Sequence, residues 1–214
     1  MPATLLPLFP LSLVMLPSSA IPLHIFEDRY KEMMGELIAS RGEFGIVLAR
    51  DEGIVSIGCT ATVEQVVERY PDGRLDIVVL GRRRFSIESL NDEKSYLRAS
   101  VEFFNDEEAR DVPRELRTRV ILAYERLRAT LSGQHTGAGP PAPEAQLDLP
   151  QMSFQVGHLI SDVTKRQMLL GLRSEIARLE YLVSILPEYT ERQEQTRLAK
   201  RVAPLNGHAK HVVD

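Results

Sequence analysis

Apolar residues near the start of the chain pass from a proline-interrupted run to a helical spacing. Residues 13–26 are mostly apolar, and the prolines at 17 and 22 predict an extended path, because proline fixes φ and is excluded from helix interiors. From Phe26 to Ile38 apolar side chains recur every three or four residues, which predicts an amphipathic helix. Gly42 stands just beyond Arg41 and is predicted to end this helix. The chain therefore begins with an extended segment and one helix that must bury a wide apolar face.

Residues 44–104 alternate polar and apolar positions and are rich in β-branched side chains, which is typical of strands. Strands are predicted at 44–50, 51–58 (after a turn), 59–70, 75–81, 83–90 and 96–104. The apolar first residues lack a basic region and are interrupted by prolines, so they are predicted to form a buried edge strand rather than a signal peptide. So many short strands joined by short turns predict a compact, curled sheet that forms a small barrel.

From Pro113 onward the spacing is helical again. Helices are predicted at 113–131, 152–160, 165–172 and 173–199, and Pro187 is expected to kink or split the last of them. Residues 132–150 are rich in glycine and proline and poor in bulky apolar side chains, which predicts a flexible loop. The predicted organisation is a β-rich subdomain at 1–106, a helical subdomain at 107–203 and a polar tail at 204–214. The fold class is α+β.

The composition of the chain indicates its cellular compartment and excludes some kinds of partner. The single cysteine, Cys59, excludes a disulfide framework and favours a reducing cytoplasm. No apolar run is long enough to predict a transmembrane helix, so no membrane partner is expected. The net charge is −4, and residues 1–106 carry 11 basic against 16 acidic side chains. An acidic β-rich half argues against general attraction to nucleic acid.

The chain lacks the motifs that assemble catalytic sites. It contains no Gly-Lys pair for a P-loop, no H-E-x-x-H, no paired C-x-x-C and no G-x-S-x-G. Cys59 stands in a strand pattern that predicts a buried, inert thiol. Ser161 and Lys165 have the spacing of a Ser/Lys dyad, but a helix cap followed by a first-turn lysine accounts for them as well. The prediction is a protein that is not an enzyme and has no metal or cofactor.

One basic cluster and several methionines are the remaining candidates for a binding surface. Arg82, Arg83 and Arg84 follow one another, and on a strand the first and third would share a face that could grip phosphates or an acidic partner. A charged edge that prevents aggregation is the simpler interpretation. Met33, Met34, Met152 and Met168 lie on apolar faces and are predicted to belong to the core.

In order and spacing, these segments resemble the amino-terminal substrate-binding domain of the ATP-dependent Lon protease, which also occurs in cereblon and in free-standing proteins. The similar segments are LLPLFPLSLVMLPSSAIPLHIFEDRYKEMM, FGIVLAR, VSIGCTATVEQV, PDGRLDIVVLGRRRFSI and KRQMLLGLRSEIARLEYLVSIL. The resemblance implies a PUA-like β pseudobarrel with one early helix, followed by a C-terminal helical bundle. Lon would continue into an ATPase and a peptidase, whereas this sequence stops at Asp214, so the resemblance implies a stand-alone binding domain with neither activity.

The resemblance implies a non-catalytic module that binds unfolded or exposed apolar segments of other proteins. Such a module could work with a separate ATPase or protease. Met15, Leu16, Arg82, Arg83, Arg84 and the loop at 132–150 are the predicted contacts. The alternative is a PUA-like RNA-binding module that uses the cluster from Arg82 to Arg84; RNA retention that depends on salt and is lost on alanine substitution would identify it.

Overall fold

The structure is a computed structural model that describes residues 5–107, 111–132 and 151–202. Its contacts divide the chain into two compact units, which are Met1–Ala109 with Pro150–Ser174 and Arg110–Leu149 with Glu175–Asp214. The sequence predicted two consecutive parts instead, with every helix after residue 107 in the second. The predicted loop from residue 133 onward and the predicted tail lie outside the described residues, so both stay predictions.

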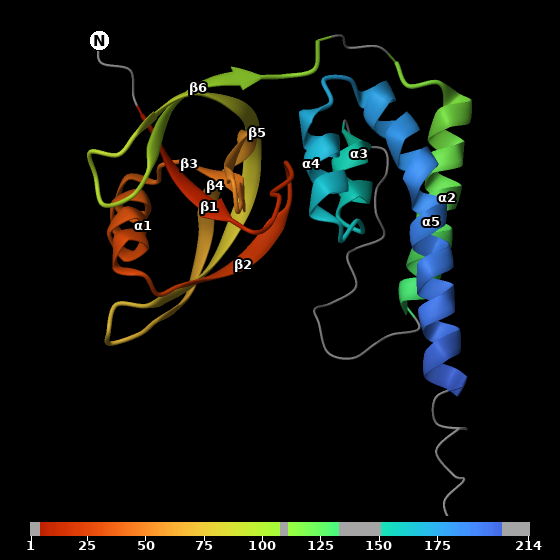
Figure 1. The fold of residues 1–214 in the computed structure, drawn as a ribbon, viewed down its shortest axis with the longest axis horizontal. Helices are drawn as coiled ribbons and strands as arrows, with labels where there is room; N and C mark the ends of the chain where they lie inside the picture. Colours follow the sequence, from red (N-terminus) through yellow and green to blue (C-terminus); the bar gives the residue numbers. More distant parts are fainter. Residues whose placement is uncertain (1–4, 108–110, 133–150, 203–214) are drawn as a thin grey trace, which may run out of the picture. The chain divides into compact units, whose positions relative to one another are not determined.

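The first unit is built around a six-stranded mixed sheet (Figure 1). Its strand order is β2-β5-β4-β3-β1-β6, and β5 also pairs with β6, so that the sheet curls back on itself. Only β1 and β3 are parallel. The strands are β1 (Leu6–Leu11), β2 (Ala20–Ile25), β3 (Phe44–Arg50), β4 (Gly53–Arg69), β5 (Leu75–Asn91) and β6 (Arg98–Phe104). The predicted α+β pseudobarrel is confirmed, and it is not a regular barrel because β2 lies outside the closed ring.

The edge of the sheet is formed by a different strand from the one predicted. β1 pairs with β3 on one side and with β6 on the other, so the amino-terminal strand is interior. β2 pairs with β5 alone and therefore lies at the edge. Pro22 stands in the middle of β2, where an edge position tolerates its missing N–H.

Two predicted pairs of strands are single long strands. β4 and β5 each have 17 residues and are joined by the predicted turn at 71–73. Register shifts interrupt their pairing between Cys59 and Ala61, between Val63 and Gln65, and between Val66 and Glu68. Such bulges bend a strand and increase its twist, so one strand can follow the curve of the ring.

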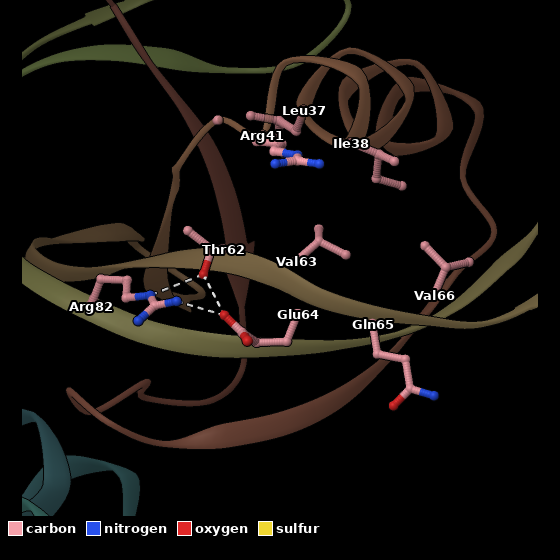
Figure 2. A pocket seen from close by; sticks show the side chains of 10 residues that line it. Leu37, Ile38, Arg41, Thr62, Val63, Glu64, Gln65, Val66 and Arg82 are labelled. Atoms are coloured by element: carbon pink, nitrogen blue, oxygen red, sulfur yellow. Dashed lines mark hydrogen bonds and ion pairs between the residues drawn. The ribbon is translucent and has the colours of Figure 1, made fainter.

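Helix α1 (Asp28–Ser40) forms where predicted and buries Tyr30, Met33, Met34 and Leu37. Phe26, the first residue of the predicted apolar face, precedes the helix and is 60% exposed. Its last turn faces β4 (Figure 2). The left-handed residue after the helix is Arg41, with φ of 54°, and not Gly42 as the sequence suggested. A Cβ on Gly42 would lie 3.1 Å from side-chain atoms of Leu37 and Ser40, so this glycine provides space for the close turn.

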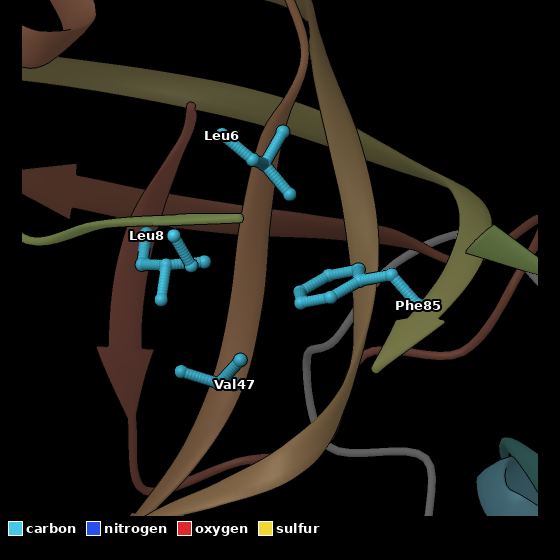
Figure 3. Close-up of a cluster of buried hydrophobic side chains, with 5 residues drawn as sticks. Leu6, Leu8, Val47 and Phe85 are labelled. Carbon is cyan, nitrogen blue, oxygen red and sulfur yellow. The ribbon is translucent and has the colours of Figure 1, made fainter. Parts of the chain in front are cut away.

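One aromatic side chain belongs to a buried cluster inside the ring. Phe85 of β5 is fully buried and packs with Leu6, Leu8, Val47 and Ala99, which come from β1, β3 and β6 (Figure 3). A Cβ on Gly45 or on Gly58 would lie 2.5 Å from the tip of the Phe85 ring. Glycine in two neighbouring strands therefore makes the room that a large side chain occupies inside a narrow ring.

Helices α3 (Met152–Gly157) and α4 (Val163–Gly171) belong to the first unit. The absent side chain of Gly157 leaves room for Leu16 and Leu169, since a Cβ there would lie 2.9 and 2.4 Å from them. Gln167 of α4 donates a hydrogen bond of 3.0 Å from Nε2 to the carbonyl oxygen of Ile57 in β4. These contacts explain why residues 150–174 group with the sheet, although they follow α2 in the chain.

His158, at the end of α3, is expected to make the stability of this unit depend on pH. The Ser19 hydroxyl lies 3.2 Å from its Nε2 atom. Burial, reinforced by the nearby Arg166 guanidinium, lowers the pKa of the His158 imidazole to about 4. The unfolded chain binds this proton near the ordinary pKa of about 6.5. The stability that the neutral ring contributes is therefore complete above about pH 6.5 and is lost as the pH falls towards 4.

We expect the free energy of unfolding to decline over this interval and to decline less in a His158→Gln variant. The change should be smaller than a fully buried histidine would give, because the residue is exposed and solvent screens the charged form of its ring. Urea titrations monitored by circular dichroism at pH 7, 5.5 and 4.5 measure the difference. Identical pH dependence in both proteins would contradict the assignment.

The second unit consists of α2 (Arg114–Ser132) packed along α5 (Glu175–Val202) (Figure 1). Pro187 lies inside α5 but does not split it into two helices. The proline is exposed, whereas Leu182, Leu186 and Tyr189 continue the buried face on both sides of it. Packing of that face maintains the helix across a position where one backbone hydrogen bond is missing.

Candidate functional site

Two of the predicted contact residues are inside the protein. Met15 is 1% exposed and Leu16 is fully buried. The carbonyl oxygen of Leu16 lies against Gly81, and its side chain lies against Gly157. In this conformation both side chains lie in the core, Met15 against Gly81 and Leu16 against Gly157 of α3, and neither is accessible to a partner.

The run of three arginines does not form one surface. The pairing of β4 with β5 passes from Cys59–Arg84 to Ala61–Gly81, so Arg82 and Arg83 together face Thr60 in a bulge. The bulge breaks the alternation of side chains that the sequence prediction assumed. Arg82 and Arg83 are exposed, whereas Arg84 turns inward and is 4% exposed.

The exposed members of the run are already paired. Arg82 forms an ion pair with Glu64 and donates to the Thr62 hydroxyl at 3.0 Å. Arg83 forms an ion pair of 3.0 Å with Glu43 and lies over the Phe103 ring. Guanidinium groups that are already paired with carboxylates do not make the continuous cationic patch that the RNA-binding alternative requires.

The candidate catalytic residues are accounted for by structural roles. Burial raises the pKa of the Cys59 thiol to about 12, so it stays protonated. The cap of α4 is Asp162, whose carboxylate accepts hydrogen bonds from the backbone N–H groups of Thr164 and Lys165. Within the described ranges, no three His, Cys, Asp or Glu side chains are grouped closely enough to hold a metal ion.

An apolar groove lies between β4 and α4. It has a volume of about 420 Å³, and its wall is mostly apolar. Met168 projects from α4 and is 57% exposed, contrary to the prediction that it belongs to the core. Gln167 lines the same groove, and its buried Oε1 atom has no hydrogen-bond partner among the described residues. Arg50, Val55, Ser56, Ile57, Thr164, Gly171 and Leu172 complete the lining.

A second pocket, also of about 420 Å³, lies between the last turn of α1 and β4 (Figure 2). Leu37, Ile38 and Arg41 extend from the end of α1 towards β4, where Thr62 and Val63 face them. Its lining is completed by Gly42, Glu64, Gln65, Val66 and Arg82. Sequence reasoning missed both pockets, because each joins segments that are far apart in the chain.

The same fold occurs in solved structures of one class of protein, the amino-terminal domains of Lon. The Lon N-terminal domain protein from Xanthomonas campestris superposes with a TM-score of 0.65 at 22% identity, over 85% of this chain and 98% of that one. The N-terminal domain of the Mycobacterium avium complex Lon protease gives a TM-score of 0.61 at 20% identity, over 88% and 98%.

Sequence comparison assigns the family. The family model of the ATP-dependent protease La (LON) substrate-binding domain matches residues 5–188, and the chain belongs to this family. Lon protease of Flavobacterium johnsoniae is 23% identical over 78% of this chain and 22% of its own length. Lon protease 2 of Syntrophobacter fumaroxidans is 21% identical over 89% and 25%. The chain thus spans about a quarter of the length of these relatives, and the matched region is the substrate-binding domain and not an ATPase or peptidase.

None of the helices in the described part of the chain is long and apolar enough to cross a membrane.

Proposed function

We propose that this chain is a non-catalytic module that binds unfolded or exposed apolar segments of other proteins, and that it does so in the groove between β4 and α4. The observation that carries the proposal is this solvent-open apolar groove in a domain of the Lon substrate-binding family. A methionine side chain adapts to differently shaped partners, because it is unbranched and polarisable. Met168 therefore suits a surface that must accept many sequences.

The groove also offers polar contacts to a polypeptide backbone. Ser56 and Thr164 line the groove and are exposed. Their hydroxyl groups can exchange hydrogen bonds with backbone N–H and C=O groups of the bound segment. Apolar side chains of the segment would contact Met168 and Ile57, and the bound protein would pass to a separate ATPase or protease.

Replacing Met168 with aspartate is expected to weaken binding of an unfolded polypeptide about tenfold, because about 1–2 kcal/mol of apolar contact is lost and a charge enters the groove. The measurement is a fluorescence anisotropy titration of labelled, reduced and carboxymethylated α-lactalbumin. Leu122→Asp is the matched control, because Leu122 is 50% exposed on α2 and does not line the groove.

Equal losses of affinity in Met168→Asp and Leu122→Asp would place the binding outside the groove. Absence of binding by the unsubstituted protein at high micromolar concentration of polypeptide would refute the function itself.

A further inference from the structure

The pocket between α1 and β4 contains a cation without a partner. Among the arginines of residues 5–107, only Arg41 and Arg69 make no side-chain hydrogen bond or ion pair with any described residue. Arg69 is at the end of β4, next to the turn, whereas the Arg41 guanidinium faces the pocket (Figure 2). The pocket also contains Arg82, whose charge is balanced by Glu64. Its net charge is therefore positive, although residues 1–106 as a whole are acidic.

Four aliphatic side chains share the wall of the pocket with Arg41 and with the polar Thr62, Glu64, Gln65 and Arg82. Leu37 and Ile38 come from α1, and Val63 and Val66 come from β4. A volume of about 420 Å³ lies within the range of about 300–1,000 Å³ that is common for ligand pockets. The pocket thus places one unpaired guanidinium beside a small group of aliphatic side chains.

The β4 segment beside the pocket has one edge without a neighbouring strand. β3 pairs with β4 only from Gly53 to Ala61, whereas β5 pairs with β4 as far as Arg69. From Thr62 onward, the side of β4 away from β5 has no strand partner in the described part of the chain. Backbone groups on such an edge can bond to an extended peptide.

From these features we propose that the pocket binds the C-terminus of a polypeptide, with the α-carboxylate on the Arg41 guanidinium and an aliphatic last side chain against Val63 and Ile38. This inference rests on the proposed function and names a second feature, a free chain end, that the module recognises in its substrates. Guanidinium and carboxylate match in charge and in planar geometry.

A chain end fits this pocket better than an internal acidic residue. In a terminal valine or leucine the carboxylate and the apolar side chain are attached to one α-carbon, so both enter the pocket together. An internal aspartate presents only its carboxylate, and its neighbours in an extended chain point to the opposite face. It would leave the aliphatic wall exposed to water.

The test uses the full chain and a fluorescein-labelled glycine–serine peptide that ends in leucine and valine with a free carboxylate. Three further peptides serve as comparisons: the same sequence amidated, the same sequence extended by two glycines, and an amidated peptide with an internal aspartate after the leucine. Arg41→Gln is compared with Arg69→Gln, which removes the same charge from the same unit and away from the pocket. Dissociation constants come from fluorescence anisotropy.

We expect the free-acid peptide to bind about tenfold more tightly than each of the other three. Arg41→Gln should abolish this preference, and Arg69→Gln should preserve it. Equal binding of acid and amide, or equal effects of the two substitutions, would overturn the inference. Equal binding of the internal-aspartate peptide would overturn the assignment to a chain end.

The α-lactalbumin titration separates the inference from the proposed function. If unfolded polypeptide binds and Met168→Asp weakens it, but the free-acid preference is absent, only the inference fails. If neither α-lactalbumin nor any peptide binds, both fail.

Discussion

Replacing Arg84 with methionine is expected to lower the free energy of unfolding by about 3–5 kcal/mol, the usual cost of breaking a buried ion pair by removing one partner. The guanidinium donates to Asp106 at 2.6 Å and to the carbonyl oxygens of Leu170 and Leu172 at 3.2 and 2.6 Å. It therefore joins β5 both to the segment after β6 and to the end of α4. Methionine fills part of the space but removes the three hydrogen bonds that the guanidinium donates to the Asp106 carboxylate and to the two carbonyl groups.

The neighbouring arginines provide matched controls. Arg82→Met and Arg83→Met remove the same side chain from exposed ion pairs, each expected to cost less than about 1 kcal/mol. Urea unfolding followed by circular dichroism and tyrosine fluorescence measures all three, because the chain has no tryptophan. Equal decreases in the free energy of unfolding for all three variants would contradict the inward orientation of Arg84.

Replacing Gly81 with alanine is expected to cost about 3 kcal/mol, at the upper end of the range for overpacking. The added Cβ would lie 2.2 Å from the carbonyl oxygen of Leu16, which is a backbone atom and cannot rotate away. Gly81 also exchanges backbone hydrogen bonds of 2.9 and 2.8 Å with Ser18 and Ser19. Relief of the clash would therefore disturb the turn that leads into β2.

Gly35→Ala is the control for this substitution. Gly35 lies inside α1, and a Cβ there would meet nothing within 4 Å. Alanine should raise the free energy of unfolding by up to about 1 kcal/mol, because it favours a helix more than glycine does. We expect the midpoint of thermal unfolding to fall for Gly81→Ala and to rise for Gly35→Ala. Destabilisation by both substitutions to the same extent would rule out a steric cause at Gly81.

Features encoded over short distances could be predicted from the sequence. The spacing from Phe26 to Ile38 gave α1, and alternation gave β3 with its observed bounds of Phe44–Arg50. The α+β class followed from the succession of these elements, and the order of the motifs indicated the Lon substrate-binding family. Periodicity suffices here because each pattern lies within one element and depends only on which face of it is buried.

Features that depend on pairing between distant segments could not be predicted in this way. The single-residue bulge opposite Thr60 turns Arg84 into the core and leaves Arg82 and Arg83 at the surface. The sequence does not distinguish the three positions, because all are arginine. From the sequence, Met15 and Leu16 were predicted to contact a partner. In the structure, Gly81 and α3 lie against them.

The sequence by itself determined which segments are helices and strands and to which family they belong. Only the tertiary structure decided which side chains are reachable: the exposed Met168 beside β4 and the unpaired Arg41 across from Val63. The physical reason is that exposure and pairing are set by neighbours in space. In both pockets those neighbours lie many residues away along the chain, beyond the reach of any local pattern.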